Sequence, residues 1–330
     1  MERFLITGGC GFIGSHLAEE LINQGKIVFV IDDLSTGRLK NISTLLDNPK
    51  FSLFIDTILN EYILEELIKK VDFVFHLAAI VGVKKVIENP IESILVNIEG
   101  TCNVLKLCAK YKKRILITST SEIYGKNLNV PFNEEADIVI GSTKKKRWSY
   151  ACAKAIDEFL AFAFQEEFGL PVIIVRLFNT VGPRQTDRYG MVIPRFVKQA
   201  LTGQPITVFG DGEQSRCFIH VKDVVEIILK LIYKDESYGE VFNIGSENEI
   251  KIKDLALLIK EITKSESEIK FINPENIYKK GFEDMMKRIP DLNKIKKIVD
   301  FHLNYSIKDI IADVVTYYKT DFLCVNDLII

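Results

Sequence analysis

The sequence predicts an α/β protein in which a doubly wound parallel sheet is followed by a smaller C-terminal α/β lobe. A glycine-rich turn at residues 8–14 lies between a short apolar run and a helix-forming segment. Short apolar runs then alternate with segments of helical period as far as residue 175. Unbroken apolar strands are typical of a parallel sheet that is covered on both faces. After Arg176, glycine and proline recur and the alternation weakens, which indicates a second unit.

Each expected element rests on hydrophobic periodicity and on the turn residues that bound it. The expected strands are residues 3–7, 27–31, 51–55, 72–76, 114–118, 172–175 and 241–244. The expected helices are residues 15–23, 58–69, 91–111, 149–168, 192–201, 220–233, 253–263 and 307–318. We expect residues 1–176 to form a Rossmann domain, to which residues of about 216–246 return, and residues 177–330 to form mainly the second lobe. The basic run at residues 144–147 is expected to be a solvated loop.

Composition excludes several classes of partner. The formal net charge is −2 over 330 residues, so nothing indicates binding to nucleic acid or to an anionic membrane. The N-terminus shows no leader, and no apolar segment is long enough to span a bilayer, so we expect a cytoplasmic protein. Six dispersed cysteines, without a C-x-x-C motif or a Cys/His cluster, predict free thiols and no metal site.

The glycine turn predicts a dinucleotide site. Its glycines permit a tight turn and let a pyrophosphate approach the N-terminus of the following helix. Asp32 ends the second strand, where its carboxylate can accept both ribose hydroxyls and would repel a 2′-phosphate, so NAD is favoured over NADP. A plain tight turn is the alternative for the glycines alone. The residues expected at the cofactor here are Gly8, Gly11, Phe12, Ile13, Gly14, Asp32, Asp33, Ser35, Thr36 and Gly37.

Tyr150 and Lys154 are spaced at i and i+4 and therefore lie on one helix face. This pair suits hydride transfer at an alcohol, in which the phenol acts as the base. A Lys ammonium about 4 Å from the phenol, at an effective dielectric of about 20, would favour the phenolate by roughly 4 kcal/mol. Alone, the pair is common on solvated helices, and it gains weight from the glycine turn and Asp32.

Taken together, these motifs resemble those of the extended short-chain dehydrogenase/reductase family that modifies nucleotide sugars. That family includes epimerases, 4,6-dehydratases and decarboxylases of UDP-glucuronate. From residue 5 to about 294, the resemblance is carried by TGGCGFIGSHL, IDDLSTG, FHLAA, TSTSEIYG, SYACAK, RLFNTVGPRQ, GDGEQSRCFIHVKDV and FEDMMKRIPDLNK. It implies an NAD-holding Rossmann domain and a C-terminal lobe that holds the nucleoside diphosphate.

The resemblance also implies roles for single residues. Thr120 would share the sugar 4-hydroxyl with Tyr150, and Lys154 would contact the nicotinamide ribose. Further cofactor contacts that it implies are Asp56, Thr57, Leu77, Ala78, Ala79, Asn97 and Thr118. Its implied substrate contacts are Asn179, Arg216 and Arg288, and Lys84 is a candidate that touches either substrate or solvent. Forked, charge-assisted hydrogen bonds suit the two arginines to a diphosphate.

Ser121 and Glu122 bear on the reaction. A 4-epimerase needs only oxidation and re-reduction at C4, whereas the matching Glu of the dehydratases and decarboxylases works near C5 and C6. In the bacterial decarboxylase of aminoarabinose synthesis, which the chain resembles near residues 147–150 and 280–290, an arginine at the position of Arg288 faces the C6 carboxylate. We therefore expect UDP-glucuronate decarboxylation first. The alternatives are a 4,6-dehydratase, for which a GDP-sugar is possible, and a 4-epimerase.

A non-catalytic NAD-binding sensor or partner protein is the alternative of another class, and it should have lost Tyr150 or Lys154. The helices expected at residues 91–111 and 149–168 carry apolar residues on more than one face. Relatives pair this helix couple across a dimer, so we expect a homodimer, although a core role would explain the same pattern.

Overall fold

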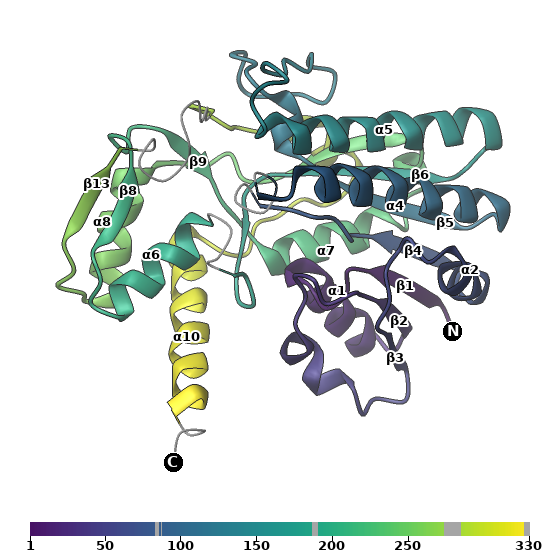
Figure 1. Cartoon of the computed structure of the whole chain (residues 1–330), viewed down its shortest axis with the longest axis horizontal. Coiled ribbons are helices and arrows are strands. Elements are labelled where there is room, and N and C mark those ends of the chain that lie inside the picture. Colours follow the sequence, from purple (N-terminus) through teal and green to yellow (C-terminus); the bar gives the residue numbers. More distant parts are fainter. Residues whose placement is uncertain (83–85, 87, 187–190, 274–284, 327–330) are drawn as a thin grey trace.

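A seven-stranded parallel sheet forms the centre of the computed structural model, which describes residues 1–82, 86, 88–186, 191–273 and 285–326 (Figure 1). The strand order is β11-β6-β5-β4-β1-β2-β3. The strands are β1 (Arg3–Thr7), β2 (Ile27–Ile31), β3 (Phe51–Phe54), β4 (Phe73–His76), β5 (Arg114–Thr120), β6 (Val172–Leu177) and β11 (Glu240–Ile244). The predicted doubly wound sheet is therefore present, and β11, distant in sequence, completes one edge of it.

Helices cover both faces of the sheet. On one face lie α1 (Phe12–Asn23) and α7 (Val221–Leu231), and on the other lie α2 (Glu61–Lys70), α4 (Pro90–Lys110) and α5 (Trp148–Phe168) (Figure 1). Strand β1 serves both layers, because Phe4 and Ile6 belong to the core under α1 and α7, whereas Leu5 belongs to the core under α2, α4 and α5. Successive side chains of a strand point to opposite faces, so a strand buried on both sides must be apolar throughout.

Local chemistry explains where the element ends differ from those expected. Helix α2 begins at Glu61, later than predicted, because the side chain of Asn60 caps it by accepting a hydrogen bond from the Ile63 N–H. Helix α4 begins at Pro90, since proline suits the first turn of a helix. Strand β5 extends to Thr120, and this places the predicted hydroxyl residues at its carboxyl end.

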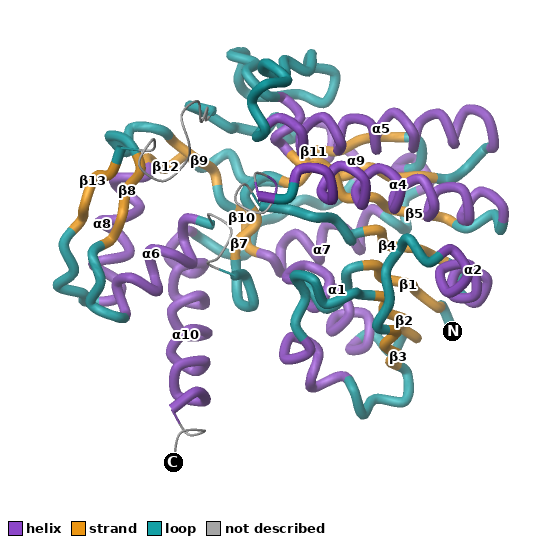
Figure 2. The backbone as a smooth tube through the Cα atoms, in the orientation of Figure 1, coloured by secondary structure: helices purple, strands orange, loops and turns teal. Residues whose placement is uncertain are grey.

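The second lobe packs α6 (Val192–Leu201), α8 (Ile252–Thr263) and α10 (Ile307–Asn326) around the strand pair β8 (Ile206–Phe209) and β13 (Ile269–Ile272). Two smaller pairs are β7 (Thr180–Val181) with β10 (Ile219–His220), and β9 (Ser215–Cys217) with β12 (Glu249–Lys251) (Figure 2). The remaining elements are α9 (Asn293–Ile298) and the 3₁₀ turns η1 (Leu39–Leu45), η2 (Ser121–Tyr124) and η3 (Asp235–Ser237). None of these short strands was predicted.

The order of the sheet reverses between β1 and β4, whose strands lie side by side and lead to helices on opposite faces. In open parallel sheets such a reversal opens a crevice at the carboxyl ends of the strands. Within the described residues, no helix has the length and apolar character that a membrane crossing requires.

Candidate active site

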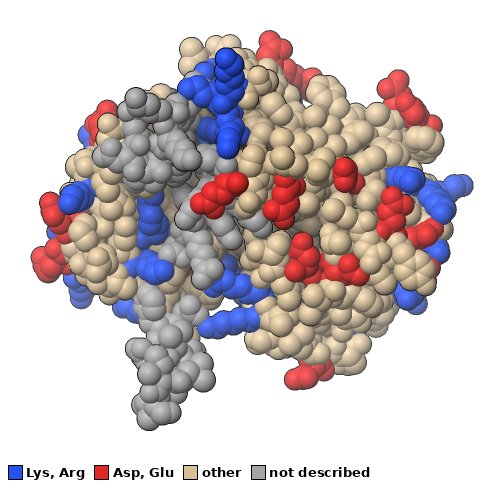
Figure 3. Space-filling model, viewed as in Figure 1, with Lys and Arg blue, Asp and Glu red and all other residues tan. Residues whose placement is uncertain are grey.

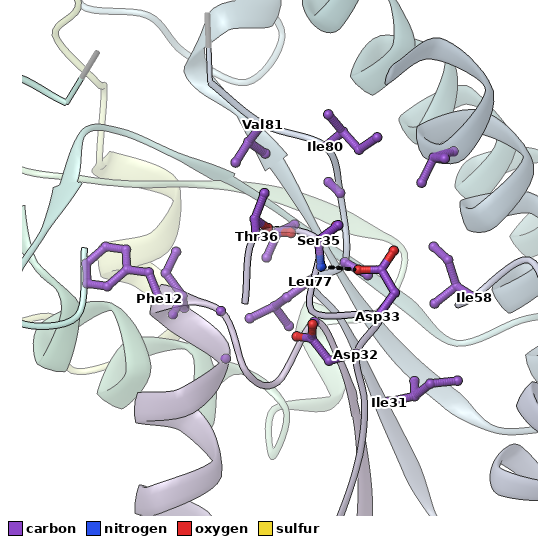
Figure 4. A pocket seen from close by; sticks show the side chains of 18 of the residues that line it. Phe12, Ile31, Asp32, Asp33, Ser35, Thr36, Ile58, Leu77, Ile80 and Val81 are labelled. Carbon is purple, nitrogen blue, oxygen red and sulfur yellow. Dashed lines mark hydrogen bonds between the residues drawn. The ribbon is translucent and has the colours of Figure 1, made fainter. Parts of the chain in front are cut away.

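Two cavities meet at the carboxyl ends of the central strands. The first has a volume of about 260 Å³ (Figure 4). It is lined by the glycine turn, the end of β2 and the loop of residues 77–81 after β4, called here the β4 loop. The second, of about 610 Å³, extends from η2 to the second lobe. Both cavities are lined by Phe12, Ile13, Val81, Thr120, Tyr150 and Leu177. A ligand in one cavity can therefore react with a ligand in the other beside Tyr150.

The glycine turn is closed so tightly that side chains are excluded. At Gly8, where φ is +73°, a Cβ atom would lie 2.9 Å from the backbone of Ala78. At Gly14 it would lie 2.3 Å from the Gly8 carbonyl oxygen. Gly11 lines the first cavity, and its missing side chain leaves the N-terminus of α1 open to a ligand. Free N–H groups at this terminus suit a pyrophosphate, so the turn fits a dinucleotide.

Asp32 joins the glycine turn to the end of β2. Its Oδ2 accepts a hydrogen bond from the Cys10 N–H at 2.8 Å, and its Oδ1 accepts one from the Leu34 N–H at 2.9 Å. Burial raises the pKa of Asp32, and the N–H groups of Leu34 and Cys10 oppose that rise. Each carboxylate oxygen retains a lone pair for a ribose hydroxyl. A Cβ atom at Gly37 would lie 2.6 Å from Oδ1, so Gly37 shields this carboxylate without lining the cavity.

The structure brings most of the other predicted cofactor residues to the first cavity. Asp33, Ser35 and Thr36 follow Asp32 along its wall, and the Ser35 N–H donates to Asp33 Oδ1 at 2.9 Å (Figure 4). Also lining it are Asp56, Thr57, Leu77, Ala78, Ala79 and Thr118.

Asn97 lies behind the cavity wall. Its side chain binds both backbone groups of Ile80, accepting from the N–H at 2.7 Å and donating to the carbonyl at 3.2 Å. Asn97 thereby holds the β4 loop in place, and it is not among the lining residues. Lys84 lies outside the described residues.

Tyr150 and Lys154 project from α5 into the first cavity, as their spacing predicted. The Lys154 ammonium donates to Asp157 Oδ2 at 2.7 Å, and both side chains are buried. Burial raises the pKa of Tyr150, the negative charges of Glu122 and Asp157 raise it further, and a hydrogen bond with Thr120 opposes the rise. This differs from the expected stabilisation of the phenolate, because burial dominates and Asp157 balances the charge of Lys154.

Glu122 and Arg288 meet in the second cavity, although 166 residues separate them. Arg288 Nη2 lies 3.4 Å from Glu122 Oε1, and Ser121 lines the same wall. The turn η2, which carries Glu122, is held against strand β11, because the Tyr124 hydroxyl donates to Asn243 Oδ1 at 2.8 Å. The Glu122 carboxylate is therefore presented by a rigid turn next to a cation.

The other predicted substrate residues also line the second cavity. Asn179 Nδ2 donates to the Cys217 carbonyl at 2.8 Å, and Arg216 Nη1 donates to the Ser215 carbonyl at 2.7 Å. These backbone contacts hold the side chains along the edge of the second lobe.

Arg147 was wrongly expected in a solvated loop. Its side chain is buried, lines the second cavity and stacks its guanidinium 5.5 Å from the centre of the Trp148 ring. The buried Trp148 draws the end of the basic run inward. Its spacing of three residues before Tyr150 places both on one helix face, and this signal could have identified Arg147.

The second cavity has the electrostatic character of an anion site. Its charged lining residues are Arg147, Arg195, Arg216, Arg288, Glu122 and Asp211. Lys and Arg side chains also lie along the boundary between the lobes on the face shown in Figure 3. No group of metal-ligating side chains was found among the residues that the structure describes.

A dinucleotide cradle that opens onto an arginine-lined cavity, with a Tyr/Lys pair at the junction, defines a Rossmann-fold enzyme acting on an anionic alcohol. The family model described as GDP-mannose 4,6 dehydratase matches residues 5–314. The chain is 43% identical over 319 residues to UDP-N-acetyl-alpha-D-glucosaminuronate decarboxylase of Bacillus cytotoxicus, covering 96% of this chain and 98% of that relative. It is 34% identical over 323 residues to UDP-glucuronic acid decarboxylase 1 of Arabidopsis thaliana, covering 97% of this chain and 71% of the relative.

Among solved structures, UDP-glucuronic acid 4-epimerase of Bacillus cereus in complex with UDP-glucuronic acid and NAD has a TM-score of 0.87 and 28% identity. It covers 96% of this chain and 99% of that one. The chain belongs to the family of NAD(P)-dependent nucleotide-sugar epimerases, dehydratases and decarboxylases within the extended short-chain dehydrogenases/reductases. The resemblance noted in the sequence is thereby confirmed.

Proposed function

We propose that the protein is an NAD-dependent decarboxylase of a UDP-hexuronate that works through a 4-keto sugar. The observation that carries the proposal is the pairing of Glu122 with Arg288 beside Tyr150 in an arginine-lined cavity. Oxidation and re-reduction at C4 require the Tyr/Lys pair and give the carboxylate of Glu122 no task. Loss of a C6 carboxylate uses Glu122 as a proton donor and Arg288 as the cation that holds the carboxylate.

NAD would occupy the first cavity, with its pyrophosphate at the N-terminus of α1 and its adenosine ribose at Asp32. When bound, it supplies the acceptor that oxidises the sugar at C4. The buried carboxylate of Asp32 favours NAD over NADP, because a 2′-phosphate would place a second anion against it.

At C4, Tyr150 would accept the proton of the sugar hydroxyl while Thr120 holds the same oxygen. Both residues lie where the two cavities join. Lys154 would bind the nicotinamide ribose and face the phenol from one turn away. Its ammonium would favour the phenolate, which burial and the charges of Glu122 and Asp157 disfavour.

At C5 and C6, a 4-ketone turns the sugar into a β-keto acid. The C5–C6 bond breaks, C6 leaves as carbon dioxide, and its electron pair remains on C5 as an enolate. Arg288 would hold the carboxylate before it leaves, and Glu122 would then return a proton to C5. Tyr150 would return its proton to the C4 oxygen as the hydride taken from C4 is given back there, so that the product differs from the substrate by carbon dioxide alone. Arg147 and Arg216 would bind the remaining negative charge of the substrate.

The sugar has two candidates within this class. The Bacillus cytotoxicus relative is named for UDP-N-acetylglucosaminuronate, a sugar with an acetamido group at C2. The Arabidopsis thaliana relative is named for UDP-glucuronic acid. Both share the C6 carboxylate and the UDP group, which are the parts that the argument from Arg288 and Glu122 concerns.

The test incubates purified protein and NAD with each of these UDP-hexuronates, with UDP-glucose and with a GDP-hexose, and reads the products by mass spectrometry. We expect one hexuronate to lose the mass of carbon dioxide. Loss of water from a neutral sugar would instead establish a 4,6-dehydratase, and an isomer of unchanged mass would establish a 4-epimerase. If no substrate is converted and no NADH forms on the protein, a non-catalytic NAD-binding protein would be favoured.

Glu122→Gln sharpens this test. Losing the proton donor at C5 should slow steady-state turnover, measured as carbon dioxide released over many cycles, by about tenfold to hundredfold, because general acid–base groups contribute on this order. Lys126→Gln is the control, because Lys126 is exposed and follows the same turn, and this variant should retain activity. Equal rates for E122Q and the unmodified protein would contradict the role of Glu122.

Two further proposals concern organisation. We propose that residues 1–176, with about 216–246, hold NAD, and that residues 177–330 mainly hold the nucleotide sugar. A homodimer that pairs α4 and α5 of two copies is supported by exposed Ile91, Leu95 and Phe159 on these helices. A cytoplasmic location stays a prediction from the sequence.

A further inference from the structure

Asp157 is a buried carboxylate that no step of the proposed reaction uses. It lies on α5, three residues after Lys154, and its side chain is 0% exposed. Its Oδ2 accepts a hydrogen bond from the Lys154 ammonium at 2.7 Å, and the Lys154 side chain is itself only 3% exposed. A buried ammonium without a counter-charge is strongly disfavoured. Asp157 therefore supplies the charge that Lys154 needs inside the protein.

Asp157 is in turn connected to the cofactor cradle by a chain of buried side chains. The Thr101 hydroxyl on α4 lowers the pKa of Asp157 and lies 3.0 Å from His76 Nε2. His76 Nδ1 lies 2.8 Å from the hydroxyl of Thr7, which also accepts the Ala78 N–H at 3.1 Å. Thr7 directly precedes the glycine turn, and Ala78 forms the opposite wall of the first cavity.

The hydrogen-bond directions follow from Thr7. Its hydroxyl accepts from the Ala78 N–H and donates to His76 Nδ1, so the His76 Nε2–H donates to the Thr101 oxygen. This assignment needs a neutral His76, and burial together with the charge of Lys154 lowers the pKa of His76 to about 3. The hydrogen-bonded chain thus runs from Thr7 through His76 to Thr101, and the Thr101 proton remains available to the nearby carboxylate of Asp157.

We propose that Asp157 is a positioning residue, which holds the Lys154 ammonium in register with Tyr150 and with the cofactor ribose through their buried ion pair. The proposal rests on the proposed role of Lys154. The charges that act on Tyr150 are those of Glu122 from η2 and Asp157 from α5. Lys154 lines the first cavity together with Tyr150, and Arg147 lines the second. The charged groups that face Asp157 are Lys154 and Glu158 from α5, with the neutral His76 on β4.

The proposal has a signature that packing alone would not give. Removing an anion favours the deprotonated form of every acid that it faces. In Asp157→Asn the ionisation of Tyr150, and with it the pH–rate profile, should move to lower pH by about one unit. The ammonium should also lose its fixed direction, which should reduce kcat by about tenfold or more with little change in KM for the nucleotide sugar.

The measurement is an ultraviolet titration of phenolate in the NAD-saturated protein, in which the difference from Tyr150→Phe isolates Tyr150. It needs no substrate, so it separates this proposal from the proposed function. Thr101→Val, which keeps the charge of Asp157 but removes the polar hydroxyl beside it, should lower kcat without the full shift in titration. Glu158→Gln is the control, because it is a buried carboxylate on the same helix that pairs with Arg176 at 2.8 Å; it should lose stability but keep the titration.

Superimposable titrations of Asp157→Asn and unmodified protein, with kcat within about twofold, would overturn the proposal and leave Asp157 a packing residue. If Asp157→Asn fails to fold, Thr101→Val decides. Normal kcat in that variant would equally overturn the positioning role.

Discussion

Tyr150 is the residue on which the proposed chemistry depends, because it touches both cavities. Its environment in the protein alone opposes ionisation, since burial and the nearby carboxylates of Glu122 and Asp157 raise its pKa. We therefore expect the phenol to be activated when the positive charge of the oxidised cofactor is added to that of Lys154. Activity should rise with pH as the phenolate forms.

Tyr150→Phe removes the proposed base without changing the shape of the ring. We expect kcat to fall by about a thousandfold, within the range for general bases, while NAD remains bound. Turnover and cofactor content measured on the same sample check this. Ser149→Ala is the matched control, because that hydroxyl only donates to the Lys146 carbonyl on the surface. A Tyr150→Phe enzyme with normal turnover would exclude the mechanism.

The glycine turn with α1 is the element that shapes the cofactor cavity. Gly14 lies within the helix, so its backbone angles would suit any residue. It must be glycine because a Cβ atom there would clash with the Gly8 carbonyl. Gly11 differs, because its nearest contact would be a looser 3.1 Å and its open side faces the ligand. The same motif thus contains one glycine required for folding and one required for binding.

Gly14→Ala and Gly11→Ala should consequently fail in different ways. We expect Gly14→Ala to lower the free energy of unfolding by about 1–3 kcal/mol, in the range of overpacked sites. Gly11→Ala should fold normally but bind NAD at least about tenfold more weakly, since its methyl group enters the pyrophosphate path. Urea denaturation and calorimetric titration with NAD distinguish them. Equal behaviour in both measurements would contradict this division.

At the scale of the whole molecule, α4 and α5 present a surface suited to a second copy. Ile91, Leu95, Ile156 and Phe159 are exposed there, and Phe159 is 70% exposed. Apolar groups gathered on adjacent helices are costly in water and are typical of association surfaces.

Phe159→Glu should convert a dimer into a monomer, because it places a charge in the centre of the proposed contact. Sedimentation at micromolar concentration measures the mass. Phe271→Glu on β13 is the control, since that ring is similarly exposed at 55% in the other lobe. An unmodified protein that sediments as a monomer, or a Phe159→Glu variant that remains a dimer, would contradict the proposed pairing.

His16 links α1 to the segment that leads into the second lobe, with Nε2 3.0 Å from the Pro183 carbonyl. Burial lowers its pKa to about 4. The unfolded chain would bind a proton at His16 near pH 6.5, whereas the folded protein would not. Between these two pH values the unfolded state holds more protons than the folded state. The contribution of His16 to the free energy of unfolding is therefore fully present above pH 6.5 and falls as the pH decreases towards 4.

His16→Gln keeps a donor for Pro183 and removes this titration. The slope of the free energy of unfolding against pH should therefore be smaller in the variant than in the unmodified protein, by at most about 1.4 kcal/mol per pH unit. Urea denaturation from pH 7.5 to 5.0 measures both slopes. Parallel curves for variant and unmodified protein would contradict a buried, neutral His16.

The core strands and the glycine turn were predictable because their signals are local. Apolar runs such as β1 and β4 can be recognised from neighbouring residues, and so can the Tyr150/Lys154 spacing. The strand pairs of the second lobe were not predictable. Strands of two or three residues, such as β7 and β9, show no periodicity, and partners distant in the chain define them.

The sequence by itself determined the alternating sheet, the dinucleotide turn, the helix that carries Tyr150 and Lys154, and the family resemblance. Only the tertiary structure decided that Glu122 faces Arg288, that Arg147 turns inward, that Asn97 stays behind the wall and that Lys154 is paired with Asp157. The physical reason is that periodicity and turn chemistry act between near neighbours along the chain. Charge pairing and burial depend instead on which distant segments the folded core brings together.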